Sequence, residues 1–178
     1  MSENIILLLV AVVVGGGLIA GILYFILRHM RGSIKLSLPQ TAFNPGNKIS
    51  GEFDLLAKKP IQGNKLIVRL IGQQVTRHHQ NGKSRTRSQE IYRDEVLVEE
   101  AKDYPAGYTG KYSFEINTPN TNETEFLNSP LGQTLNAAVR LLSNRNTRLQ
   151  WRVEARLDAK GIDLVAAKKI TLNTKFIG

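Results

Sequence analysis

The residues with the clearest chemical capacity are two adjacent histidines, His78 and His79, because imidazole groups bind metal ions and exchange protons near neutral pH. Adjacent residues of a strand point to opposite faces, so these two rings are poorly placed to hold one ion. The same polar segment offers a single carboxylate, Glu90, and the chain has no cysteine. The third histidine, His29, is expected to flank a membrane segment. The sequence therefore predicts no metal site and no cofactor.

A group of carboxylates is the next candidate, because paired carboxyl groups catalyse acid–base steps when their environments separate their pKa values. No apolar or aromatic residues frame this group, so we expect ordinary solvated carboxylates along a strand edge. The chain also lacks a Gly-x-Ser-x-Gly elbow, a phosphate loop and a dinucleotide fingerprint. The sequence thus predicts no enzymatic activity. The carboxylates are Asp94, Glu95, Glu99, Glu100 and Asp103.

Two groups of basic residues are stronger candidates for binding. Anionic lipid headgroups and an acidic partner protein both suit such groups. Nucleic acid is not expected, because neither group contains base-stacking aromatic residues, and a solvated face without a partner is the remaining interpretation. The first group, at a predicted hairpin tip, is Arg77, Lys83, Arg85 and Arg87. The second, where a predicted helix ends and the next strand begins, is Arg140, Arg145, Arg148 and Arg152.

The elements that must position these groups are limited by length and composition. The chain has 178 residues, a formal net charge of +9 and no cysteine, which excludes disulfides and thiolate metal sites. About 150 residues outside the apolar start suit one domain with its own core. All 24 Lys and Arg lie in residues 28–178 with 14 of the 15 acids, so that part carries +10.

Residues 5–27 form an uncharged apolar stretch of 23 residues, which is long enough to cross a bilayer as a helix. A buried core helix of this length would usually show one polar face. A cleaved signal peptide would have a basic start, a shorter apolar run and a small-x-small exit, which this stretch lacks. We predict an uncleaved transmembrane helix over 5–27.

The flanks of this stretch predict its orientation. Arg28, Arg31 and Lys35 follow the stretch closely and no Lys or Arg precedes it, and such positive residues stay on the cytoplasmic side. We expect residues 1–4 outside, 28–32 as a basic juxtamembrane linker, and the remaining chain on the cytoplasmic side of the inner or plasma membrane. Within the stretch, Gly17 and Gly21 form a small-xxx-small pair that permits close helix packing.

The rest of the chain alternates apolar and polar residues with a period of two, which is typical of half-buried strands. Asn81-Gly82 is a strong hairpin signal between the third and fourth alternating segments. Trp151 lies at an apolar position of the most regular segment, so it is expected in the core. The segments are 33–38, 49–55, 66–76, 91–99, 111–117, 149–158 and 164–172.

Residues 120–147 interrupt this pattern. Apolar residues recur with helical spacing over 131–142, Ser129 is suited to cap a helix and Pro130 suits its first turn. We predict one short amphipathic helix inserted between two strands and a tail over 174–178. The strands with short turns predict an all-β, immunoglobulin-like sandwich over 33–173.

Four segments, taken in order, carry a further resemblance. They are 46–53, then 59–61 with 65–72, then 106–119, and 151–161. Their order and spacing resemble arrestin-like domains, the broad group that includes bacterial sporulation-control proteins and Vps26-type retromer proteins. The resemblance covers residues 33–173 and matches the N-terminal one of the two lobes usual in that group. It implies a sandwich that binds other proteins and does not catalyse reactions.

These observations predict a membrane-anchored cytoplasmic adaptor or scaffold that binds partner proteins, expected to be membrane-associated, at an anionic membrane surface. An accessory subunit of a larger membrane complex, held through the glycine-bearing helix, is the alternative. Pairing of two copies to mimic a two-lobed form also stays open.

Overall fold

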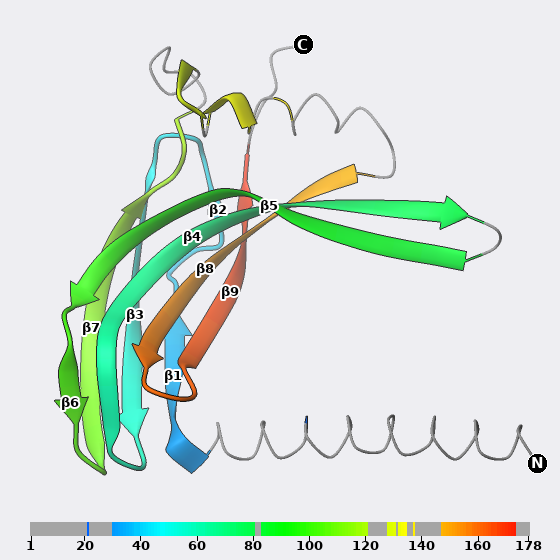
Figure 1. Cartoon of the computed structure of the whole chain (residues 1–178). Helices are drawn as coiled ribbons and strands as arrows, with labels where there is room; N and C mark the ends of the chain where they lie inside the picture. The colour runs from blue at the N-terminus through cyan, green and yellow to red at the C-terminus, as the bar shows by residue number, and fades with distance from the viewer. Residues whose placement is uncertain are drawn as a thin grey trace, which may run out of the picture.

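The computed structural model describes residues 21, 30–80, 83–120, 128–130, 132–134, 137 and 147–173. Its strands are β1 Gly32–Ser37, β2 Ala42–Phe43, β3 Lys48–Ala57, β4 Ile61–Gln80, β5 Lys83–Glu99, β6 Lys102–Tyr104, β7 Tyr108–Asn117, β8 Thr147–Ala159 and β9 Leu164–Leu172. Six of the seven alternating segments of the sequence lie within one of these strands, and the first, 33–38, extends one residue past the end of β1. The described chain is therefore almost entirely β (Figure 1).

The strands form two sheets. The smaller sheet has the order β1-β3-β7 and is antiparallel throughout. The larger sheet has the order β2-β9-β8-β4-β5, and β6 pairs with the start of β4. Apolar side chains from the inner faces of both sheets form one core, as expected for a β-sandwich.

The core follows from the alternation in the sequence. In β3 every second residue from Ile49 is buried and the residues between them are largely exposed. Trp151 of β8 is 4% exposed and belongs to the core, which confirms the prediction for this residue. The ring of Trp151 packs against Tyr92 of β5 with ring centroids 5.5 Å apart, and it covers Gly72 of β4.

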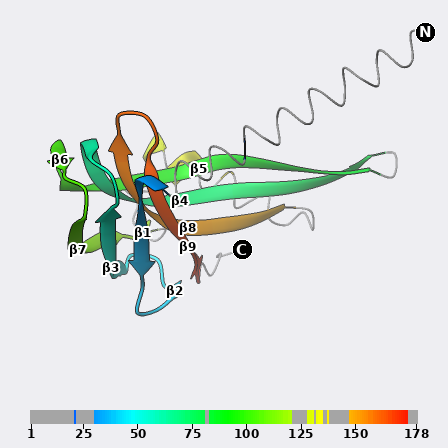
Figure 2. The ribbon, with the colours of Figure 1, turned by 90° about the horizontal axis from the view of Figure 1, so that it is seen from below.

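Two strands extend well beyond the sandwich. Pairing of β4 with β8 ends at Thr76, whereas pairing of β4 with β5 continues to Gln80 and Lys83. Figure 2 shows β4 and β5 continuing past the end of β8 as a two-stranded ribbon. We call this ribbon, residues 77–80 and 83–87, the arm. The pairing Gln80 with Lys83 leaves two residues, 81–82, for the turn, as the Asn-Gly signal predicts.

The arm joins the core at a tightly packed root. A Cβ on Gly72 would lie 2.7 Å from the Trp151 ring, so only glycine lets the indole lie flat on β4. Next to Gly72 the register of β4 and β5 shifts, because Gly72 pairs with Tyr92 while Gln73 pairs with Glu90. Ile91 is thus the extra residue of a β-bulge.

Several predictions fall mostly outside the described residues. In the part of the chain that the structure describes, no helix is long and apolar enough to span a bilayer, and of the predicted span only Gly21 falls in that part. Of the predicted inserted helix, residues 132–134 and 137 are described and have helical backbone. The Ser129 hydroxyl accepts a hydrogen bond from the Gly132 amide at 3.0 Å, which is N-cap geometry. The tail over 174–178 also lies outside the described residues.

Candidate binding surfaces

The arm presents its cations on two different faces. Lys83, Arg85 and Arg87 occupy alternate positions of β5, so they point to the same side, about 7 Å apart. All three side chains are exposed. Together they form what we call the cationic face of the arm.

Arg77 lies on the opposite face of the arm, although the sequence grouped it with these three residues. It pairs with Thr86, the residue between Arg85 and Arg87, and paired residues share a face. Its Nε donates a hydrogen bond to the Ser84 hydroxyl at 2.8 Å. The predicted basic group is therefore divided by the register of the hairpin.

Of the described members of the second predicted basic group, Arg148 lies nearest the first group. Arg148 is exposed at the start of β8 and pairs with Val75, which shares a face with Arg77. Arg152 lies further along this face, with its Nε 3.7 Å from Glu154. Arg140 and Arg145 lie outside the described residues.

Arg31, predicted as a membrane-flanking topology signal, also has a structural role. Its guanidinium donates to the main-chain carbonyls of Ile162 at 3.1 Å and Lys160 at 2.6 Å, in the β8–β9 turn. Its own carbonyl accepts from the amides of Lys58 at 3.0 Å and Lys59 at 3.2 Å, in the β3–β4 turn. Arg31 thus fixes the start of β1 to both turns.

Gly161 makes room for this contact. Its φ of +98° is a left-handed conformation that L side chains rarely adopt, and a Cβ there would lie 2.9 Å from Arg31 Nη1. The β8–β9 turn is therefore shaped to receive the guanidinium.

The remaining predicted residues near the N-terminus are placed differently. Lys35 is exposed within β1 on the outer face of the smaller sheet, where it pairs with Asp54. Gly21 has helical backbone, and no atom of the described residues lies within 4 Å of the position a Cβ would take, leaving aside its own helix and chain neighbours. Arg28 and Gly17 lie outside the described residues.

The predicted acidic group is divided between two faces of the larger sheet. Glu95 pairs with Arg69 on the outer face and binds both Lys65 and Arg69 at 3.0 Å. Glu99 instead shares the side of the buried Leu66. The two carboxylates therefore do not form a catalytic pair.

Glu99 is the centre of a polar cluster that joins β5, β6 and β7. Its carboxylate accepts from the hydroxyls of Tyr112 at 2.7 Å and Tyr104 at 2.8 Å, and from Lys102 Nζ at 2.7 Å. The hydroxyls of Tyr108 and Tyr112 lie 2.9 Å apart. Because β5 belongs to the larger sheet and β7 to the smaller one, this cluster closes one side of the sandwich.

The cluster also determines how its groups ionise. Burial alone would raise the pKa of Glu99, but hydrogen bonds from Lys102, Tyr112 and Tyr104 outweigh it and hold that pKa below its usual value. Burial and the Glu99 carboxylate raise the pKa of Tyr104. Glu99 is therefore charged at neutral pH, and its carboxylate is hydrogen-bonded to Lys102, Tyr104 and Tyr112.

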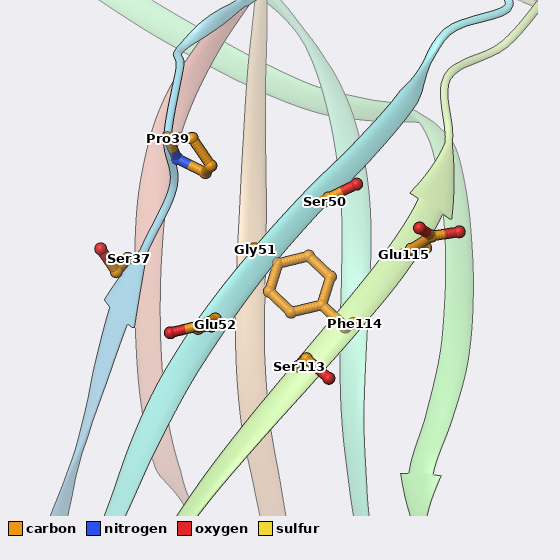
Figure 3. Close-up of a pocket in the computed structure, with 8 residues that line it drawn as sticks. All are labelled: Ser37, Pro39, Ser50, Gly51, Glu52, Ser113, Phe114 and Glu115. Atoms are coloured by element: carbon orange, nitrogen blue, oxygen red, sulfur yellow. The ribbon is translucent and has the colours of Figure 1, made fainter.

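The outer face of the smaller sheet has an open hollow of about 610 Å³ (Figure 3). Three of its lining residues carry short hydroxyl side chains, and Gly51 and Phe114 form part of its floor. Glu52 and Glu115 lie at its sides, and each is paired with a lysine, at 2.8 Å from Lys111 and 3.2 Å from Lys48. The hollow offers hydroxyl groups to a polar ligand but no unpaired carboxylate. The hydroxyl residues are Ser37, Ser50 and Ser113.

Three lysines that the sequence analysis did not single out gather at the end of the sandwich near Arg31. Lys58 and Lys59 lie in the β3–β4 turn and Lys160 lies in the β8–β9 turn, and all three are exposed. About a hundred residues separate Lys160 from the other two, so only the fold brings them together. We call these three residues the basal lysines.

Comparison with known proteins identifies the fold. No protein-family model and no curated protein matches the chain. Among solved structures it is similar to Spo0M, a sporulation control protein from Bacillus subtilis, with 13% identity and a TM-score of 0.54 over 81% of this chain and 50% of Spo0M. The chain thus spans about half the length of Spo0M. The chain has a distant fold relationship to Spo0M and an arrestin-like β-sandwich, as its ordered sequence motifs predict.

A second similarity is weaker. The alkylpurine DNA glycosylase AlkC of Pseudomonas fluorescens, in a structure bound to DNA containing an abasic site analog, shows 15% identity and a TM-score of 0.39. The match covers 81% of this chain and 31% of AlkC. At that TM-score the similarity carries no argument about fold or function.

Proposed function

We propose that the protein is a single-pass, membrane-anchored adaptor that binds partner proteins at the cytoplasmic surface and catalyses no reaction. The cationic face of the arm carries the proposal. It presents three exposed cations, Lys83, Arg85 and Arg87, on a ribbon that leaves the sandwich. None of the ion pairs found among the described residues involves these side chains.

The proposed anchor is the uncharged stretch over 5–27, with its N-terminal end outside the cytoplasm. One observation that supports this anchor is the short length of chain between the stretch and the sandwich. Three residues lie between Leu27 and Arg31, so their Cα atoms are at most about 14 Å apart along the chain. Arg31 is bound to two turns of the sandwich. An adaptor anchored in this way is concentrated near other membrane proteins.

The proposed partner is an acidic protein surface. A row of cations about 7 Å apart complements a surface of carboxylates and steers it in through long-range attraction. The arm adds a geometric argument, because a protruding ribbon reaches a concave or recessed acidic site that the flat sandwich cannot enter. Anionic lipid and nucleic acid are the alternative ligands, and the experiment below separates them.

The test is crosslinked capture of partners by the full-length protein in membranes, comparing Arg85→Glu with Arg77→Glu. Both variants change the charge by the same amount. The two arginines lie on opposite faces of the same ribbon, so the comparison tests the face and not the total charge. We expect Arg85→Glu to lose the captured protein and Arg77→Glu to retain it. Equal loss in both variants would show a nonspecific charge effect. Capture of lipid or nucleic acid alone would contradict the adaptor proposal.

An accessory subunit of a membrane complex is the second candidate. Gly21 provides the observation in its favour. Its backbone is helical, and no atom of the described residues, apart from its own helix and chain neighbours, lies within 4 Å of the position that a Cβ would take. Replacing Gly17 and Gly21 by Leu would disrupt close packing on a partner helix. Loss of the complex in this variant, with arm-dependent capture unchanged, would favour the subunit over the adaptor.

A further inference from the structure

We infer that the basal lysines Lys58, Lys59 and Lys160 dock the sandwich on anionic lipid headgroups and so fix its orientation on the membrane. This inference rests on the proposed anchor over 5–27 but concerns a different surface from the proposed partner site. The ligand is the bilayer that holds the protein, and the docking residues lie at the opposite end of β4 from the arm.

The first argument is proximity. The carbonyl of Arg31 accepts hydrogen bonds from the amides of Lys58 and Lys59, and its guanidinium binds the carbonyl of Lys160. The main chain of each of the three lysines is therefore hydrogen-bonded to Arg31. With three residues between the proposed span and Arg31, these lysines are held close to the headgroup region.

The second argument is charge and exposure. The three lysines are exposed, and their flexible stems let the ammonium groups reach the headgroups. The acids nearest in sequence are Asp54, which pairs in register with Lys35 and Lys111, and Asp158 and Asp163, which lie against Lys65 and Arg156. Asp103 is exposed on β6 beside the start of β4. The basal end thus carries more positive than negative charge, which complements an anionic leaflet.

The third argument is that the arm cannot serve this role at the same time. Strand β4 begins beside the β3–β4 turn and reaches the end of the arm after twenty residues, about 60 Å of chain. Figure 1 shows the arm leaving the sandwich at the end opposite the start of β1. At physiological ionic strength a charge is screened over about 8 Å, so cations at the far end contribute little attraction to the anchoring leaflet.

The inference can be tested because the chain has no cysteine, so a single introduced cysteine carries a unique label. Ala106 is exposed and is followed by Gly107, whose amide donates to Ala57 beside Lys58, so Ala106→Cys reports on the basal end. Thr86→Cys reports on the arm. The full-length protein is placed in nanodiscs of phosphatidylcholine with or without phosphatidylglycerol, and quenching of each label by a headgroup-bound nitroxide is measured.

We expect quenching of the label at residue 106 only in discs with phosphatidylglycerol, and no quenching of the label at residue 86. Replacing the three basal lysines by Gln should lower the ratio of docked to undocked molecules by about a hundredfold. The matched control replaces Lys83, Arg85 and Arg87 by Gln, which removes the same charge from the arm. That control should leave the quenching at residue 106 unchanged.

The results separate this inference from the proposed function. Protein that stays in the bilayer after an alkaline wash but shows no quenching at residue 106 would overturn the docking alone. Equal quenching in discs without phosphatidylglycerol, or equal loss in the arm control, would also overturn it. Release of the protein by the alkaline wash would overturn the anchor, and the docking with it.

Discussion

The basal lysines at one end of β4 and the cationic face of the arm at the other are each made of three exposed cations, but the structure holds them in different ways. At the basal end, Lys58, Lys59 and Lys160 lie in two turns that Arg31 joins, one through its main-chain carbonyl and the other through its guanidinium. At the other end, Lys83 and Arg85 lie on a ribbon that has no third strand beyond Thr76, and Arg87 pairs with Thr76 at the base of that ribbon. Two-stranded ribbons are marginally stable in water, so the arm depends on its root for support.

This difference indicates a division of work. A site that fixes orientation needs a rigid base close to its ligand. A site that binds a separate partner protein benefits from extending away from the core, where the partner can approach it. Removing support should therefore destabilise the protein strongly at the arm root and measurably at the basal end, whereas changes to the arm cations should hardly affect its stability.

The largest effect is expected at the root of the arm. Trp151→Ala removes a large buried side chain from the contact with Gly72 and Tyr92, and it should lower the free energy of unfolding by about 3–5 kcal/mol. Urea denaturation of the purified protein measures this change. A loss below 1 kcal/mol would show that the root is not part of the core and would remove the basis of the comparison.

The next effect is expected at the basal end. Arg31→Gln removes the hydrogen bonds from the guanidinium to Lys160 and Ile162, and it should lower the free energy of unfolding by about 1–3 kcal/mol. Lys35→Gln is the control, since this exposed residue should change it by less than about 0.5 kcal/mol. Equal effects of the two changes would mean that Arg31 acts only as a topology signal.

A pH-dependent effect is expected at the Glu99 cluster. The pKa of Glu99 is lowered in the folded protein, so its stabilising contribution is present above the ordinary glutamate pKa. It is lost as the pH falls through the lowered value. Glu99→Gln should therefore weaken the acid dependence of the free energy of unfolding in that range, measured by urea denaturation at several pH values. Glu100→Gln, at an exposed neighbour, should leave the dependence as in the native protein.

The smallest effect on stability is expected in the arm. Replacing Arg85 or Arg87 by Glu alters an exposed side chain outside the core and should change the free energy of unfolding by less than about 0.5 kcal/mol. The same denaturation experiment checks this, with Trp151→Ala as the reference for a large loss. A destabilisation close to that of Arg31→Gln would show that the arm cations support the fold and would weaken their assignment to binding.

The sequence predicted the sandwich well because its strands alternate strongly. The apolar positions from Leu149 to Leu157 form the clearest case, and Trp151 lies in the core as expected. The short strands β2 and β6 were not predicted, because two or three residues carry no period and are defined by their pairing partners.

The candidate binding surfaces were predicted only in part. The polar strands of the arm show no alternation, so the sequence assigned their cations by proximity alone. The Asn81-Gly82 signal could have separated them, because a two-residue turn requires Gln80 to pair with Lys83 and Arg77 to pair with Thr86. The basal lysines come from turns far apart in the sequence, and no local pattern joins them. The contact of Arg31 with the β8–β9 turn likewise depends on the tertiary structure.

The bulge at Ile91 has a consequence for how charge is encoded in this chain. If Ile91 instead paired with Gln73, so that no bulge formed, the turn after Gln80 would be one residue longer and every cation of the arm would keep its identity. Arg77 would then pair with Arg87, and both would share one face with Arg85. The faces on which the arm presents its cations are thus set by the bulge, and a one-residue shift in register would rearrange the recognition surface without changing its composition.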